Sequence, residues 1–119
     1  VMKYWQTYAV HLIEPIIFNT QNRGEVKDVH SIRLGDIQQT LISWENLSAY
    51  LKITGNNSCP LEFKYFGENG NFIVKQFKDS YRCFRASLKA FIHQVNQKQN
   101  CIKREETLEI VSILEWGKI

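Results

Sequence analysis

Cysteine is scarce in this sequence, and its placement excludes two classes of small domain. The three cysteines, Cys59, Cys83 and Cys101, are widely spaced and form no C-x-x-C pair. Domains held by disulfides use an even and dense set of cysteines, and zinc sites use closely spaced cysteine and histidine ligands. We therefore expect no disulfide framework and no metal site. A reducing compartment fits this pattern, so the predicted location is the cytoplasm.

Long hydrophobic runs and a strong excess of one charge are missing as well. The longest apolar run, from Leu12 to Phe18, is interrupted by Glu14 and Pro15, whereas a membrane-spanning helix needs about 18 or more apolar residues. The formal net charge is only +3 and the basic residues are scattered, whereas a nucleic-acid-binding domain usually concentrates them in a stripe. We expect neither a membrane nor a nucleic acid among the partners.

Motifs that hold cofactors or carry hydrolytic chemistry are absent too. The sequence has no G-x-S-x-G, H-E-x-x-H or P-loop pattern, which removes the usual support for a hydrolase or a phosphotransferase. No G-x-G-x-x-G follows a predicted strand, and Gly67 and Gly70 lie in a predicted hairpin turn. A turn of that kind offers no helix N-terminus to a phosphate. We expect no dinucleotide site within this chain.

The residues that are present predict one domain in which helices flank a run of strands. The chain has 119 residues, 44% of them hydrophobic, which suffices for one core. Apolar residues recur every three or four positions, as in amphipathic helices, at about 3–20, 81–95 and 105–116. We expect Pro15 to bend or break the first helix. Alternation of apolar and polar residues predicts strands at about 25–34, 38–44, 47–53, 60–66 and 71–78.

Short connections between the predicted strands favour antiparallel pairing, because a parallel crossover needs about a dozen or more residues. The order of a helix, strands and two helices indicates an α+β fold with a mostly antiparallel, open-faced sheet that helices cover on one side.

The other side of this sheet would expose large side chains, and we expect a second copy to pack on it. Bulges that turn these side chains inward are the alternative. The residues concerned are Tyr50, Phe66, Ile73 and Phe77.

His11 is the strongest candidate for acid/base chemistry. It lies in the middle of the first predicted helix, on the same side as Thr7, four residues before it, and Glu14, three residues after it. A histidine that is oriented by a carboxylate one helical turn away can donate or accept a proton near neutral pH. The alternative is a histidine packed against the sheet and bonded to a neighbour.

Parts of the chain resemble a family of oxidoreductases. The segment YAVHLIEPI, residues 8–16, is similar to the first helix of the C-terminal domain in the glucose-fructose oxidoreductase and inositol dehydrogenase (Gfo/Idh/MocA) family. The segments FRASLKAFIHQV and REETLEIVSILEWG resemble the closing helices of that domain. The resemblance extends over almost the whole chain, although the strand-rich middle, 25–78, agrees only in order and length.

The resemblance implies one half of an enzyme. In this family an N-terminal dinucleotide-binding domain holds NAD or NADP, and the C-terminal α+β domain supplies part of a sugar or polyol site and a sheet used for oligomerisation. The family often has a D-x-x-x-H motif, whose histidine assists proton transfer while the hydride passes to the nicotinamide. His11 matches that histidine, and Tyr8 and Glu14 would be neighbours of the substrate cleft. Thr7 stands where the family has aspartate, and a neutral hydroxyl cannot stabilise an imidazolium as a carboxylate does.

The sequence therefore predicts a C-terminal substrate-binding and oligomerisation domain of an NAD(P)-dependent oxidoreductase that acts on a sugar or polyol. Its dinucleotide-binding domain would be a partner outside this chain. Because the cofactor carries hydride transfer, we expect no catalysis from residues 1–119 alone. The alternative is a freestanding, non-catalytic α+β module that binds a ligand or a protein and dimerises through its sheet, and Thr7 favours this alternative.

Overall fold

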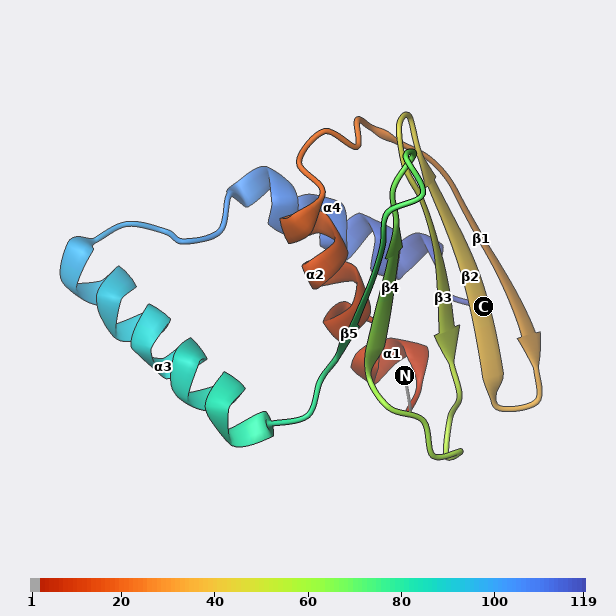
Figure 1. Ribbon diagram of the computed structural model, residues 1–119, viewed down its shortest axis with the longest axis horizontal. Coiled ribbons are helices and arrows are strands. Elements are labelled where there is room, and N and C mark those ends of the chain that lie inside the picture. The colour runs from red at the N-terminus through yellow and green to blue at the C-terminus, as the bar shows by residue number, and fades with distance from the viewer. Residues whose placement is uncertain (1–2) are drawn as a thin grey trace.

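The computed structural model describes residues 3–119 and confirms the α+β class, with helices on one side of an antiparallel sheet (Figure 1). The helices are α1 (Trp5–Tyr8), α2 (Val10–Asn19), α3 (Ser80–Gln97) and α4 (Arg104–Trp116). The strands are β1 (Val26–Leu34), β2 (Ile37–Trp44), β3 (Ser48–Ile53), β4 (Glu62–Phe66) and β5 (Phe72–Gln76). Each of the strands predicted from alternation is therefore present, within a residue or two of its expected bounds.

The strands form two sheets rather than one. A three-stranded sheet has the order β1-β2-β3, and β4 and β5 form a separate two-stranded hairpin. All pairs are antiparallel, with Val29 opposite Ile42 and Thr40 opposite Leu51. Gly35, with a φ of +58°, forms the tight turn between β1 and β2, a conformation that costs glycine little because it has no Cβ.

Pro15 does not break the first helical segment. The helix is interrupted at Ala9, between α1 and α2, whereas Pro15 lies inside α2, which continues to Asn19. Proline removes one backbone donor and crowds the preceding turn. Buried side chains on both sides of Pro15, among them Leu12, Ile13 and Ile17, hold α2 against the core, and this packing outweighs the lost hydrogen bond.

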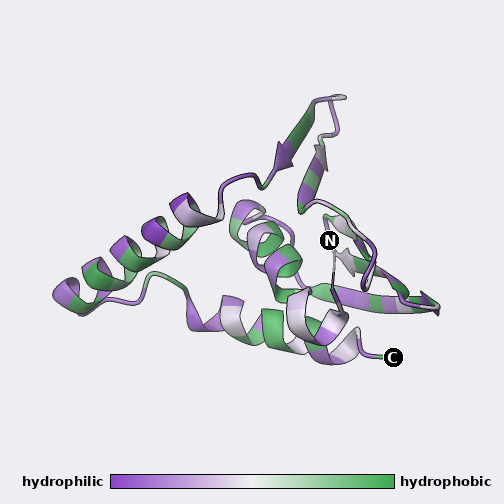
Figure 2. Ribbon diagram, turned by 90° about the horizontal axis from the view of Figure 1, so that it is seen from below, coloured by the Kyte–Doolittle hydropathy of each residue, from purple (hydrophilic) through white to green (hydrophobic). Residues whose placement is uncertain are grey.

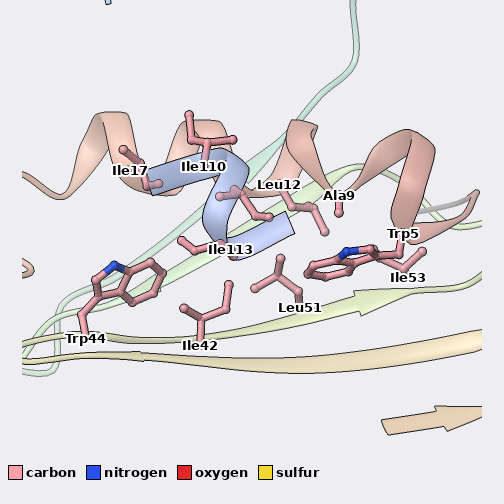
Figure 3. Close-up of a cluster of buried hydrophobic side chains, with 11 residues drawn as sticks. Trp5, Ala9, Leu12, Ile17, Ile42, Trp44, Leu51, Ile53, Ile110 and Ile113 are labelled. Carbon is pink, nitrogen blue, oxygen red and sulfur yellow. The ribbon is translucent and has the colours of Figure 1, made fainter. Parts of the chain in front are cut away.

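The core lies between the three-stranded sheet and helices α1, α2 and α4 (Figure 3). Alternate residues of β2 and β3 point inward, and the helices contribute residues at spacings of three and four. Burial of each large apolar side chain contributes roughly 1.5–3 kcal/mol to the free energy of unfolding. The buried apolar residues are Trp5, Ala9, Leu12, Ile13, Ile17, Ile42, Trp44, Leu51, Ile53, Ile110 and Ile113.

A bidentate ion pair fastens α4 to the segment that follows α2. The guanidinium of Arg23 donates to both carboxylate oxygens of Glu109, at 3.0 and 2.6 Å, and to the carbonyls of Ile17 and Thr20. The indole nitrogen of Trp44 donates to Glu109 at 2.7 Å. Burial disfavours the charged carboxylate, but the hydrogen bonds from Arg23 and Trp44 outweigh it and hold the pKa of Glu109 below its ordinary value.

Helix α3 takes no part in covering the sheet. It stands away from the other helices, at the end of an extended connection from β5 (Figure 2). None of its residues is buried. Asp79 caps its first turn by accepting a hydrogen bond from the backbone N–H of Arg82 at 3.0 Å.

Candidate functional site

Helices α1 and α2 present one face to the core and the opposite face to solvent. Trp5 and Ala9 are buried, and the indole nitrogen of Trp5 donates to the carbonyl of Leu114 at 2.9 Å, which ties α1 to α4. Tyr8 and His11 lie on the exposed face. The fold therefore holds these two side chains on a well-anchored helical surface.

His11 and Tyr8 are brought together as the sequence suggests. Their rings meet edge to face, with centroids 5.0 Å apart and planes at 72°. His11 is exposed, so the alternative of a histidine packed against the sheet is wrong. The imidazole is open to a ligand that approaches this face. Tyr8 restricts the ring on one side, which favours a defined orientation.

Thr7 and Glu14 contribute less than a catalytic dyad would require. The hydroxyl of Thr7 donates to the backbone carbonyl of Tyr4 at 3.2 Å, so its single proton is used within its own turn. Glu14 is exposed one turn beyond His11, where water screens its charge strongly. The structure thus places His11, Tyr8 and Glu14 on an exposed helical surface.

A separate groove opens between α2, β3 and β4. It has a volume of about 560 Å³, and β3 and β4 lie on either side of it as edge strands of two different sheets. Leu12 and Ile16 of α2, Ala49 of β3, and Phe63 and Tyr65 of β4 make its walls mainly apolar. His11, Tyr8 and Glu14 are not among its lining residues, so the predicted site residues and the groove are distinct surfaces.

The polar groups of the groove are few. Glu62 and Lys64 form an ion pair at 3.4 Å on its rim. Burial raises the pKa of the Tyr65 phenol, and a hydrogen bond with Asn19 opposes this only in part, so the phenol stays neutral. A polyol needs several convergent donors and acceptors, and the groove is better suited to apolar side chains. This surface has no signal in the sequence, because its walls come from elements whose adjacency only the tertiary structure sets.

The outward face of the three-stranded sheet is exposed, as an open-faced sheet requires. Ile32, Leu41 and Tyr50 project from it, with exposed fractions of 55%, 44% and 61%. Phe66 and Ile73 are exposed as well, so the alternative that these side chains turn inward is wrong. Phe66 and Ile73 belong to the separate β4–β5 hairpin and lie on its opposite faces, so the predicted residues do not form one continuous patch.

Within 3–119, no group of three or more histidine, cysteine or acidic side chains is placed to hold a metal ion. No helix in the same range has the length and apolar character needed to cross a bilayer.

Comparison of the chain with models of protein families, with curated proteins and with solved structures finds no match in any of the three.

Proposed function

We propose that the chain is the substrate-side and oligomerisation domain of an NAD(P)-dependent oxidoreductase acting on a sugar or polyol. One observation carries this proposal: the imidazole of His11 is exposed on a helical face that buried Trp5 and Ala9 fix in place, with Tyr8 against its edge. A proton-transfer group needs to reach a substrate hydroxyl. The His11 face meets this need once a second surface closes over it.

The partner that closes this face is a dinucleotide-binding domain. It would supply NAD or NADP, which accepts or donates the hydride. In this arrangement His11 moves the proton of the substrate hydroxyl, Tyr8 orients the imidazole, and Glu14 lies at the margin of the cleft. The similarity of residues 8–16 and of the two closing helices to the Gfo/Idh/MocA family supports this assignment.

The test is a substitution in the longest natural form of the polypeptide that contains these residues. His11→Ala should lower kcat/KM for polyol-dependent NAD(P) reduction by roughly 10²–10⁴-fold, the usual contribution of a positioned acid or base. His93→Ala is the matched control, because His93 is an exposed histidine on α3 and should leave turnover unchanged. Turnover that survives His11→Ala would remove His11 from the mechanism.

A second function, a non-catalytic binding module, is favoured by one specific observation. Thr7 replaces the carboxylate that would support an imidazolium, and its hydroxyl donates to Tyr4. A module of this kind would keep its self-association and ligand binding in the His11→Ala variant. Its longest natural form would show no NAD(P)-dependent turnover before the substitution either, which separates it from the oxidoreductase.

A further inference from the structure

Helix α3 carries a broad apolar stripe that nothing in residues 3–119 covers. Its members recur at spacings of three and four residues, and each is between 49% and 74% exposed. This is the pattern of a helix that packs onto an apolar surface. The α3 stripe comprises Tyr81, Phe84, Leu88, Phe91, Ile92 and Val95.

The α3 stripe is large enough to form an interface. Aromatic side chains offer about 150–250 Å² each, so the exposed part of the stripe is on the order of 600 Å². The largest apolar patch on a typical monomer is itself roughly 300–600 Å² and often functional. Two such stripes, each docked on a surface of equal area, would bury on the order of 2,000 Å², above the roughly 1,600 Å² of a standard stable interface.

The groove between α2, β3 and β4 offers a matching seat. Its apolar walls include Ala49, Phe63 and Tyr65, and Phe63 and Ala49 also pack against the core. Its volume of about 560 Å³ suits a few large side chains such as those of Phe84 and Phe91. An amphipathic helix that lays its apolar face into a groove is a common recognition mode, with anchors at spacings such as those of the α3 stripe.

Within one chain, α3 is poorly placed to reach this groove. The groove lies along β4, on the edge opposite the one that pairs with β5, and α3 follows β5. The backbone N–H of Phe77 donates to the carbonyl of Leu61, and Asp79 caps α3. Only Lys78 separates these two fixed residues, so the connection leaves little length for α3 to fold back across the hairpin.

Charge also argues against antiparallel pairing between two α3 helices. Arg82, Arg85 and Lys89 run beside the α3 stripe at spacings of three and four residues, and α3 contains no aspartate or glutamate. A face-to-face antiparallel pair of these helices would set the two rows of cations against each other. The groove carries one acidic and two basic side chains on its walls, Glu62, Lys52 and Lys64, a much weaker concentration of like charge.

We propose that two copies of the chain exchange α3, each helix docking its apolar stripe into the groove of the other copy. Short connections that cannot fold back favour such exchange, and reciprocal exchange closes the assembly at a dimer. The groove shares Leu41 and Tyr50 with the outward face of the β1–β2–β3 sheet, whereas Ile32 belongs to that face alone. The α3 exchange does not depend on the oxidoreductase assignment.

The first test measures the mass of the 119-residue chain in solution, by light scattering or sedimentation over a range of concentrations. We expect a concentration-dependent dimer, and the double variant Phe84→Glu/Phe91→Glu should weaken dimerisation by at least about tenfold. Ala86→Glu/Ala90→Glu is the matched control, since both alanines are exposed on α3 outside the stripe. All four positions are exposed, so circular dichroism should show every variant folded. A chain that stays monomeric, or a dimer indifferent to the Phe84→Glu/Phe91→Glu change, would overturn the proposal.

A second test identifies the contact itself. One chain keeps only Cys59, which lines the groove, through Cys83→Ser and Cys101→Ser. The other carries all three cysteine-to-serine changes together with Leu88→Cys, and a tag makes it heavier. A short bismaleimide should link the two chains into a mixed dimer, and Ala90→Cys in place of Leu88→Cys should not. Exclusive linkage between two Leu88→Cys chains would contradict docking in the groove.

Discussion

Gly117 is the residue at which α1, α4 and the sheet meet. It ends α4, and a Cβ at this position would overlap ring carbons of Trp5. Its carbonyl accepts hydrogen bonds from Gln38 at 2.7 Å and Ser31 at 3.0 Å. The φ of −80° is ordinary, so the requirement for glycine here is space rather than backbone freedom.

Gly117→Ala should lower the free energy of unfolding by about 1–3 kcal/mol, because Trp5 must move to admit the methyl group. Urea unfolding followed by tryptophan fluorescence measures this change. Gly67→Ala is the control, since its Cβ would meet only ordinary contacts with Asn71, and it should change stability by less than about 0.5 kcal/mol. Equal effects of the two substitutions would show that Trp5 does not pack on Gly117.

Glu109 should make the stability of the fold depend on pH. Its pKa is lower in the folded chain than the ordinary 4.5, so the folded chain binds fewer protons in that range. The stabilisation is complete above about pH 4.5 and is lost as the pH falls through the folded-state pKa. Glu109→Gln should cost about 3 kcal/mol at pH 7, as expected for breaking a mostly buried pair, and the difference from the unmodified chain should shrink toward pH 3.

The control for this pH series is Glu45→Gln. Glu45 pairs with Lys27 at 2.8 Å, but both side chains are well exposed, so the change should leave the free energy of unfolding nearly unchanged. If Glu109→Gln leaves the acid limb of the stability profile unchanged, the ion pair with Arg23 does not form in solution. Arg23 itself could not be identified from the sequence, because its partner lies 86 residues away and Gln21–Gly24 has only the appearance of a loop.

At the scale of elements, local patterns predicted the strands well, because alternation in β2 and β3 directly matches the inward and outward faces of the sheet. Helical spacing placed His11 on the side of Thr7 and Glu14 but left open whether its ring packs against the sheet, and the structure shows it exposed. A break at Pro15 was wrongly expected from local reasoning, since packing of Leu12, Ile13 and Ile17 keeps α2 continuous through the proline. The interruption at Ala9 has no signal in the sequence that we recognise.

Helix α3 depends on its own cap more than on packing within the chain. Asp79→Ala removes the acceptor for the Arg82 N–H and should lower the local stability of α3 by about 1 kcal/mol. Because α3 has no buried residue, hydrogen exchange in dilute solution should show faster exchange in α3 only, with core strands unaffected. Ser80→Ala is the neighbouring control. An equal loss of protection in β2 would mean that α3 is part of the cooperative core.

At the scale of the whole molecule, the sequence indicated an open-faced sheet but could not separate its strands into two sheets. The absence of a β3–β4 ladder, the groove between them and the isolated position of α3 all depend on tertiary arrangement. The periodicity of α3 is that of a core helix, and its exposure in the structure is what identifies it as an interface.

The outward face of the sheet gives a separate prediction for self-association. Ile32 and Leu34 project from β1 and are 55% and 82% exposed, and neither lines the groove. If a second copy packs on this face, Ile32→Arg/Leu34→Arg should remove one association step while leaving the α3 exchange intact. Asn69→Arg, at the turn of the β4–β5 hairpin, should change neither the association through the sheet face nor the α3 exchange. Sedimentation of the unmodified chain and the two variants at matched concentrations measures the mass of each assembly.

The central claim is that this domain supplies a proton-transfer face and depends on a partner domain for its cofactor. The most direct measurement compares residues 1–119 with the longest natural form that contains them, following NAD and NADP reduction at 340 nm with a panel of sugars and polyols. We expect turnover by the longer form, and neither turnover nor specific NAD(P) binding by residues 1–119 alone. Specific binding and turnover by the isolated domain would contradict it.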